Sequence, residues 1–153
     1  MLNRRSSLTR SPLARSSGGE RVRTPRKRSR SGPTDTTRQG VYERDGFACC
    51  RCTRPVSDST PVSIHHRTPR GMGGTRAPSI NEAPNLLLLC GSGTTGCHGW
   101  VESHRDDARR DGFLVASWEA PETVPFRDLA GDWWLLPDKF ERILVGVGGQ
   151  VAP

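Results

Sequence analysis

The sequence predicts a small α+β domain that is stapled by a structural metal ion and preceded by a disordered N-terminal arm. Of its 153 residues only 33% are hydrophobic, whereas 17 are Gly and 12 are Pro, so the apolar core is small and needs a further source of stability. Five cysteines without an export signal favour metal binding over a disulfide framework. Short apolar runs typical of strands stand on either side of one helical pattern, which predicts a mixed fold.

Residues 1–34 are the predicted arm. They carry ten Lys and Arg against the single acid Glu20, a charge of about +9, whereas the rest of the chain has 13 basic and 15 acidic residues. Because the arm has no apolar periodicity, it cannot offset the entropy of folding by burying surface, and we expect it to be disordered. It can neutralise DNA phosphates, or it can be a tail without a role, and both interpretations stay open.

No segment is apolar enough for a membrane span or for the core of a signal peptide. The longest apolar run is Leu86 to Cys90. The Ser- and Arg-rich start resembles an organellar transit peptide in composition, but it lacks the apolar helix face of one. We therefore expect a cytoplasmic protein.

Two cysteine pairs predict a four-cysteine zinc site. Cys49 and Cys52 form a Cys-x-x-Cys motif, which places two thiolates on one tight turn, and Cys90 and Cys97 form a second pair whose intervening loop can fold back. Four thiolates leave no position for a substrate water, so this zinc is expected to be structural and coupled to folding. The alternative is a set of reduced thiols or a redox pair, and Cys50 is expected to be a spare core thiol.

Adjacent histidines end a strand-like segment between the two cysteine pairs. Residues 62–67 alternate as a strand does and include His65 and His66. Because neighbouring strand residues point to opposite faces, one imidazole can bind a metal while the other accepts a proton. A lone histidine is more often structural, but this pair is followed by a Gly-rich loop at residues 69–74 and by another Cys-His.

Residues 97–110 are predicted to form one helix with a metal-binding face. His98 and Glu102 are four residues apart and share a side of the helix, whereas His104 is rotated by about 240° from His98 and is a fallback ligand. Together with His65, this pair could hold one divalent ion with positions left for phosphate and water.

Two further features follow from local pattern. Asn85 precedes the apolar run that ends at Cys90, and it is either a site residue or a plain turn residue or helix cap. Residues 113–118 and 132–136 are expected to be two strands that pair as a hairpin, with aromatic side chains that pack or stack on bases. The predicted divisions are 35–118 for the main domain, 119–145 for a C-terminal strand extension and 146–153 for a flexible tail.

The order of these motifs resembles the HNH endonucleases, a family with the ββα-metal (His-Me finger) fold. The order is Cys-x-x-Cys, His-His, a Gly-rich loop, Asn-Leu-x-x-Leu-Cys at 85–90 and Cys-His at 97–98. The stretch 89–101, LCGSGTTGCHGWV, is similar to the small HNH proteins of tailed bacteriophages that are often encoded beside the packaging genes. The resemblance covers about residues 38–118.

The resemblance implies a fold and a role for each candidate residue. The fold is a β-hairpin followed by a helix. His65 and His98 are implied as ligands of a catalytic ion, His66 as the general base, and Asn85 as the residue that orients His66. Some relatives carry a histidine where this chain has Glu102, so the third ligand departs from the family, although a carboxylate suits a hard metal.

These expectations describe a metal-dependent DNA endonuclease with a structural Zn²⁺ and a catalytic Mg²⁺, Mn²⁺ or Ni²⁺. Arg67 and Arg70 lie beside the histidines and either clamp backbone phosphates or are solvated loop arginines. The expected partners are DNA and phage terminase or packaging proteins, in the cytoplasm of a bacterial host cell. Two alternatives stay open. One is a non-catalytic zinc module that binds DNA or a terminase-like partner, and the other is a restriction or homing enzyme with the same active site.

Overall fold

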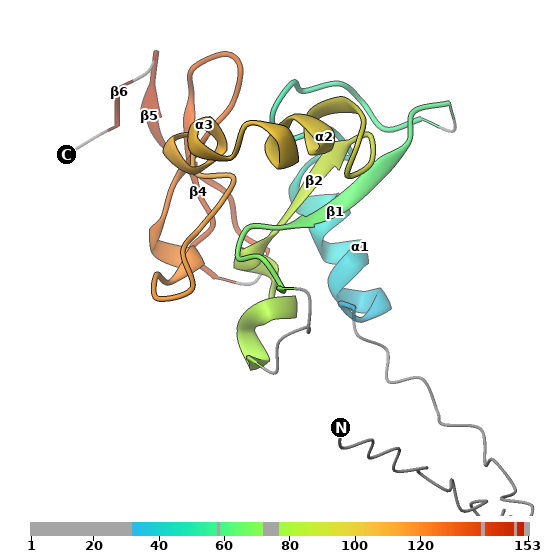
Figure 1. The fold of residues 1–153 in the computed structure, drawn as a ribbon, viewed down its shortest axis with the longest axis horizontal. Helices are drawn as coiled ribbons and strands as arrows, with labels where there is room; N and C mark the ends of the chain where they lie inside the picture. Colours follow the sequence, from blue (N-terminus) through green and yellow to red (C-terminus); the bar gives the residue numbers. More distant parts are fainter. Residues whose placement is uncertain (1–31, 58, 72–76, 139, 149, 152–153) are drawn as a thin grey trace, which may run out of the picture.

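The computed structural model describes residues 32–57, 59–71, 77–138, 140–148 and 150–151, and it confirms a mixed fold of helices and strands (Figure 1). Residues 1–31 of the predicted arm lie outside these ranges, so the disorder of this part stays a prediction. The helices and strands in chain order are α1 (Asp35–Arg44), β1 (Val62–His66), β2 (Leu86–Cys90), α2 (Gly96–Ser103), α3 (Arg105–Arg110), β3 (Phe126–Arg127), β4 (Trp133–Leu135), β5 (Ile143–Val147) and β6 (Gln150–Val151). Three short 3₁₀ helices cover Pro78–Asn81, Ala83–Asn85 and Pro121–Thr123.

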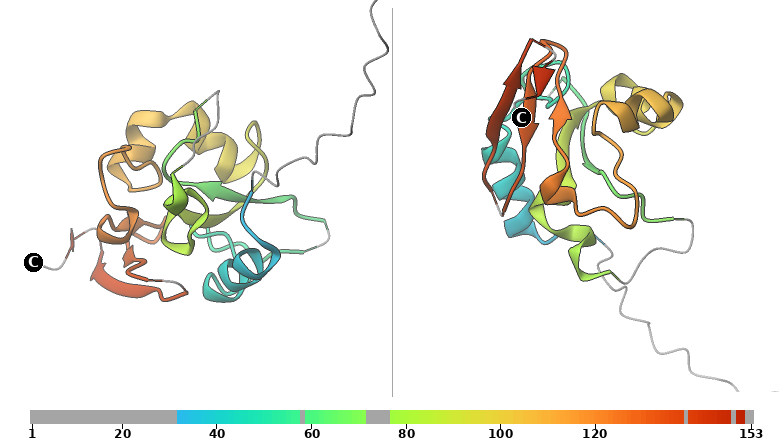
Figure 2. Two further views of the ribbon diagram at one scale, coloured as in Figure 1. Left: turned by 90° about the horizontal axis from the view of Figure 1, so that it is seen from below. Right: turned by 90° about the vertical axis from the view of Figure 1, so that its left-hand side faces the viewer.

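Two antiparallel strands form the centre of the domain. β1 pairs with β2 so that Val62 lies opposite Cys90 and His66 lies opposite Leu86. All five residues of β2 are buried, because the strand is covered on both faces. Figure 2 shows the β1–β2 ribbon between two layers, with α2 and α3 on one side and α1 and β5 on the other.

A buried ion pair ties the end of α1 to β2. The Nε of Arg44 donates to Oδ1 of Asp45 at 2.7 Å, and both side chains are buried. The same guanidinium donates to the carbonyls of Ala83 and Leu86, while the second Asp45 oxygen accepts the N–H of Leu88. These bonds satisfy both charges, which is the condition for burying such a pair.

The helix predicted over residues 97–110 is two helices. α2 ends at Ser103, the backbone leaves helical geometry at His104 with φ −121° and ψ 57°, and α3 starts at Arg105. The Ser103 hydroxyl donates to main-chain carbonyls of the preceding turn, and such bonds compete with the helical ladder. Gly112 follows α3 with φ +75°, a left-handed conformation that is common where a helix ends.

The predicted hairpin of residues 113–118 with 132–136 is wrong in its first strand. The observed sheet has the order β3-β4-β5-β6, and only β4 corresponds to a predicted strand. The segment 113–116 is instead a buried loop whose Val115 N–H donates to the carbonyl of Arg67. An apolar run does not specify its hydrogen-bond partner, and here the main-chain N–H groups of Phe113 and Leu114 donate to Ala108 of α3, while that of Val115 donates to the residue after β1.

The predicted flexible tail is in part a pair of strands. Gly146 lies opposite Val151 and Val147 lies opposite Gln150 in the antiparallel pair β5–β6. The high glycine content of this segment lowers strand propensity but leaves the main-chain donors and acceptors intact, so pairing with a neighbouring strand remains possible.

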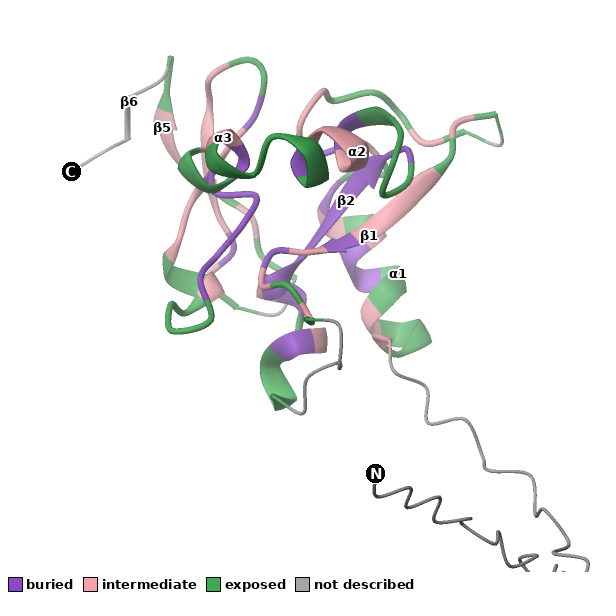
Figure 3. Ribbon diagram, viewed as in Figure 1, coloured by how far each residue is buried: buried purple, intermediate pink, exposed green. Residues whose placement is uncertain are grey.

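The core lies between the central ribbon, α2 and the loop after α3 (Figure 3). Three of its buried residues, Cys49, Cys90 and Cys97, belong to the candidate four-cysteine site, and Cys52 packs against it, so this site lies within the core. Among the described residues, no helix is both long and apolar enough to cross a membrane. The buried members of this core are Cys49, Cys50, Leu87, Leu89, Cys90, Cys97, Val101, Ala108, Phe113, Leu114, Phe126 and Leu136.

Candidate metal centres and the histidine pocket

The four predicted cysteines converge on one point. The sulfur atoms of Cys49, Cys52, Cys90 and Cys97 all lie within 4.8 Å of one another. The distance between Sγ of Cys52 and Sγ of Cys90 is 3.8 Å. Zn–S bonds of about 2.3 Å in a tetrahedron separate the sulfurs by about 3.8 Å, so the donor set fits a zinc ion. The two pairs therefore form a four-cysteine cluster that could hold a metal.

One thiol of this cluster, that of Cys49, favours the negatively charged form. The Cys97 thiol donates a hydrogen bond that lowers the pKa of Cys49 to about 4, while the same bond raises the pKa of Cys97. The main-chain N–H of Cys97 also donates to the sulfur of Cys90 at 3.5 Å. Thiolates are the ligands that zinc needs, and main-chain N–H bonds to them are typical of a closed structural site.

Glycines allow the long loop between the second cysteine pair to fold back. Gly91 has φ +89° and Gly96 has φ +62°. A Cβ at Gly91 would overlap the carbonyl oxygen of Thr95, and one at Gly96 would lie 2.6 Å from the carbonyl oxygen of Cys90. The turn therefore requires glycine at both positions, which explains how a spacing wider than Cys-x-x-Cys brings Cys97 back to the cluster.

Cys50 lies in the core and outside the cluster of sulfurs, as predicted for a spare thiol. It is completely buried, and burial is the main cause that raises the pKa of its thiol well above the usual value. A neutral thiol is a small apolar group in such a place.

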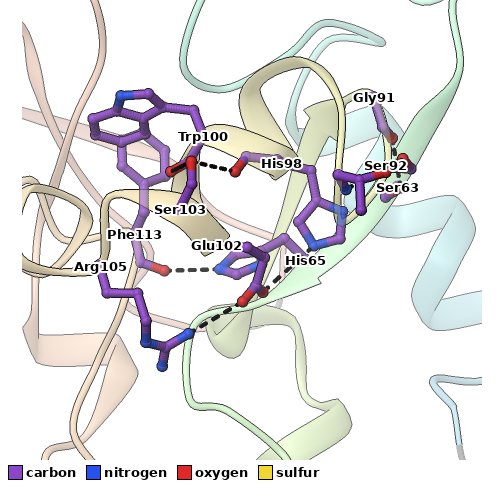
Figure 4. Close-up of polar contacts among 12 residues, drawn as sticks. Ser63, His65, Gly91, Ser92, His98, Trp100, Glu102, Ser103, Arg105 and Phe113 are labelled. Atoms are coloured by element: carbon purple, nitrogen blue, oxygen red, sulfur yellow. Dashed lines mark hydrogen bonds and ion pairs between the residues drawn. The ribbon is translucent and has the colours of Figure 1, made fainter.

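A second group of candidate ligands is formed by one residue of β1 and two residues of α2 (Figure 4). One ligand atom each of His65, His98 and Glu102 lies within 4.8 Å of the others, and the two imidazole centroids are 5.2 Å apart. The Nε2–H of His65 donates to the carbonyl of Phe113 at 2.9 Å, since a carbonyl only accepts, so Nδ1 carries the lone pair that a metal would need. Nδ1 of His98 is buried without a hydrogen-bond partner among the described residues.

Both imidazoles in this group are neutral at neutral pH. Burial lowers the pKa of His65 to about 3, and the Phe113 carbonyl offsets this only in part. Burial also lowers the pKa of His98, against the opposing effect of the Glu102 carboxylate. Neutral imidazole is the form that binds a metal, so both rings are in the form that a metal ion would need.

His66 is oriented by Asn81 and Arg70. Its Nε2 lies 3.1 Å from Oδ1 of Asn81 and 2.7 Å from an N–H nitrogen of Arg70, which also donates to Asn81 at 3.0 Å. Burial is the largest cause that lowers the pKa of His66, and the Arg70 charge adds to the effect. The imidazole is therefore neutral and able to accept a proton. The sequence contains no local signal for Asn81, which a 3₁₀ helix places here.

Asn85 does not reach His66, contrary to the role implied by the resemblance. Its Oδ1 accepts the main-chain N–H of Thr68 at 2.8 Å, and its Nδ2 donates to the carbonyl of Ile80 at 2.9 Å. The side chain is buried, and both its oxygen and its nitrogen have main-chain partners. Asn85 therefore fixes the loop after β1 through these main-chain contacts.

Arg67 is buried, so the expectation that it contacts phosphates is wrong. Its guanidinium donates to the carbonyls of Gly112, Pro121 and Val124 at 2.9, 2.8 and 2.6 Å, and burial lowers its pKa to about 9. At the end of β1, His66 and Arg67 take opposite sides of the backbone, and the Arg67 side faces the loop after α3. It is a structural residue that holds this loop.

A shallow pocket of about 190 Å³ joins the histidine group to two arginines. His65, His66, His98 and Glu102 share this pocket with Arg70, which was predicted, and with Arg105, which was not. His104 lies elsewhere, stacked on Trp100 with 5.5 Å between ring centroids, so the fallback ligand is not part of the group. The lining residues are Ile64, His65, His66, Pro69, Arg70, His98, Glu102, Arg105 and Leu114.

No protein-family model, no curated protein and no solved structure matches this chain.

Proposed function

We propose that this protein is a metal-dependent DNA endonuclease of the HNH type. The observation that carries the proposal is one pocket that combines three neutral imidazoles, a carboxylate and two guanidinium groups. The order of elements supports it as well, because His65 comes from the first of two antiparallel strands and His98 from the helix that follows them. This is the arrangement that the sequence resemblance implies for a ββα-metal domain.

His65, His98 and Glu102 would hold the divalent ion. The two imidazole nitrogens suit Ni²⁺, the carboxylate oxygen suits Mn²⁺ or Mg²⁺, and three protein ligands leave positions for a phosphate oxygen and water. When bound, such an ion stabilises the negative charge of the pentavalent phosphorus and of the departing 3′ oxygen. The four-cysteine cluster would hold a structural zinc, whose closed coordination excludes it from the chemistry.

His66 is the proposed general base. For this role its Nε2–H donates to Oδ1 of Asn81, and Nδ1 accepts the proton of the attacking water. In the free protein Arg70 competes by donating to the same Nε2. A DNA phosphate is a stronger partner for a guanidinium than a neutral imidazole is, so binding of substrate would move Arg70 from His66 to the phosphate and leave the Asn81 contact in place.

Plasmid cleavage by the zinc-loaded protein with Mg²⁺, Mn²⁺ or Ni²⁺ tests the proposal. We expect the wild type to cleave and His66→Ala to lose about 100-fold or more of the rate, because a positioned general base contributes about that much. His104→Ala is the matched control, since it removes an imidazole outside the pocket, and it should cleave at the wild-type rate.

Each other outcome has a definite meaning, provided that all variants retain their zinc. Equal cleavage by the wild type and His66→Ala would overturn the assignment of the base. DNA binding without cleavage under all conditions would favour the alternative of a non-catalytic zinc module that binds DNA or a terminase-like partner. The resemblance extends the proposal to an accessory role in phage DNA packaging, and stimulation of cleavage by a purified terminase subunit would support that partner.

A further inference from the structure

Arg105 holds the carboxylate that completes the histidine group. It is the first residue of α3, and its side chain extends back to the last turn of α2. One terminal nitrogen donates to Oε2 of Glu102 at 3.1 Å. The other oxygen of this carboxylate, Oε1, is 3.9 Å from Nε2 of His98. Glu102 therefore lies between a guanidinium and an imidazole, with one oxygen facing each (Figure 4).

The contact is too exposed for a large effect on stability. The side chains of Arg105 and Glu102 are 47% and 43% exposed. Ion pairs at that exposure contribute little to folding, because solvent screens them and both side chains lose freedom. Arg110 and Asp107 on the same helix form a similar pair, and that pair lies outside the pocket. What distinguishes Arg105 is its place in the wall of the pocket that contains His65, His66 and His98.

We propose that Arg105 is a positioning residue for Glu102 and also a phosphate contact of the nuclease site. This inference rests on the proposed function. A carboxylate that turns freely in solvent is a poor metal ligand, and a fixed donor on its outer oxygen directs the inner oxygen to the metal. The contact to Glu102 uses one terminal nitrogen of a fork that offers five donors, so others can bind an oxygen of the DNA backbone.

Arg70 and Arg105 then contact the substrate from two directions. Arg70 contacts the proposed base, and Arg105 contacts the proposed metal ligand, and both line one small pocket. A DNA strand in this pocket would place consecutive phosphates against the two guanidinium groups. The chemistry that Arg105 recognises is therefore a phosphodiester backbone rather than a base, which adds affinity without sequence preference.

Metal binding measures the positioning role separately from catalysis. We would titrate Ni²⁺ into the full-length, zinc-loaded protein by calorimetry and compare Arg105→Gln, Arg105→Lys and the charge-matched control Arg110→Gln. We expect Arg105→Gln to weaken Ni²⁺ binding by about 10-fold, which is the usual effect of removing an outer partner of a ligand. Arg105→Lys should be intermediate, and Arg110→Gln should equal the wild type.

The salt dependence of DNA binding measures the phosphate contact. In Arg105→Gln the slope of log K against log salt should fall in magnitude by about 0.9, the value for one phosphate, whereas Arg105→Lys and Arg110→Gln should keep the wild-type slope. Equal Ni²⁺ affinity in the wild type and Arg105→Gln would overturn the positioning role. An unchanged slope in Arg105→Gln, or an equal fall in Arg110→Gln, would overturn the phosphate contact. If the wild type itself bound no Ni²⁺ beyond its zinc, the proposed function would fail instead.

Discussion

Arg67 and Arg70 are three residues apart and have opposite surroundings. The Arg67 guanidinium is buried among main-chain carbonyls, whereas Arg70 lies in the wall of the histidine pocket. A similar division separates Asn85, which is buried and bonded to the backbone, from Asn81, which contacts His66. At this scale the hydrogen-bond partners of a side chain indicate its role better than its residue type does.

Substitution of the two asparagines distinguishes their roles. Asn85→Ala removes two buried hydrogen bonds and should lower the free energy of unfolding by about 2–3 kcal/mol. Asn81→Ala removes a half-exposed contact and should change stability by less than about 1 kcal/mol, yet lower the cleavage rate by about 10-fold or more because the His66 ring is no longer fixed. Urea unfolding and plasmid cleavage measure the two effects. An Asn85→Ala variant that cleaves DNA slowly but is as stable as the wild type would contradict this assignment of roles.

Helix α2 connects the two candidate metal centres. Cys97 belongs to the four-cysteine cluster and His98, the next residue, belongs to the histidine group. Across the ribbon, Cys90 on β2 belongs to the cluster and His65 on β1 belongs to the histidine group. A zinc ion that joins β2 to the start of α2 would therefore also set the distance between His65 and His98.

Cysteine substitutions test this connection. Cys97→Ala should lose the bound zinc, lower the free energy of unfolding by several kcal/mol and abolish Ni²⁺ binding by the histidines, because the metal supplies folding energy and holds α2 in place. Cys50→Ala is the control, since Cys50 is buried but outside the cluster, and it should retain one zinc per chain at a cost of about 1 kcal/mol. Zinc content by a colorimetric chelator and thermal unfolding measure both. Full zinc content in Cys97→Ala would exclude the four-cysteine site.

The excess of positive charge and the candidate site lie in different parts of the sequence. The ten Lys and Arg of residues 1–34 give that part about +9, while the remaining residues sum to −2. The described core, by contrast, is built from residues between Val41 and Leu136. Non-specific attraction to DNA is thus expected to come chiefly from the arm, with the pocket contributing only a few phosphate contacts.

Deletion of residues 1–31 tests whether the arm supplies most of the non-specific affinity for DNA. We expect zinc content and melting temperature to stay at wild-type values, since the core lies in later residues. DNA binding should weaken, and the salt slope should fall in magnitude by about 0.9 for every arginine or lysine of the arm that contacts a phosphate. Cleavage at saturating DNA should be unchanged. Unaltered affinity and slope would instead identify the arm as a tail without a role in binding.

The sequence by itself determined the mixed fold, the two cysteine pairs and the strand that ends in two histidines. These features depend on local spacing, on side-chain periodicity and on residue types with few alternative roles. It also indicated the strand around Trp133–Leu135 and the helical region that carries Cys97 and His98. Each of these is decided by residues that are close together along the chain.

Only the tertiary structure decided the partners of the polar groups. Asn81 rather than Asn85 contacts His66, Arg67 is buried, and Arg105 joins the pocket. The segment 113–116 is a loop because its main-chain bonds go to α3 and to the residue after β1, and not to β4. The physical reason is the same for Asn81, for Arg67 and for the bond between Val115 and Arg67. A hydrogen bond between residues 15 to 57 positions apart depends on how separate elements pack, and a local pattern contains no information on that packing.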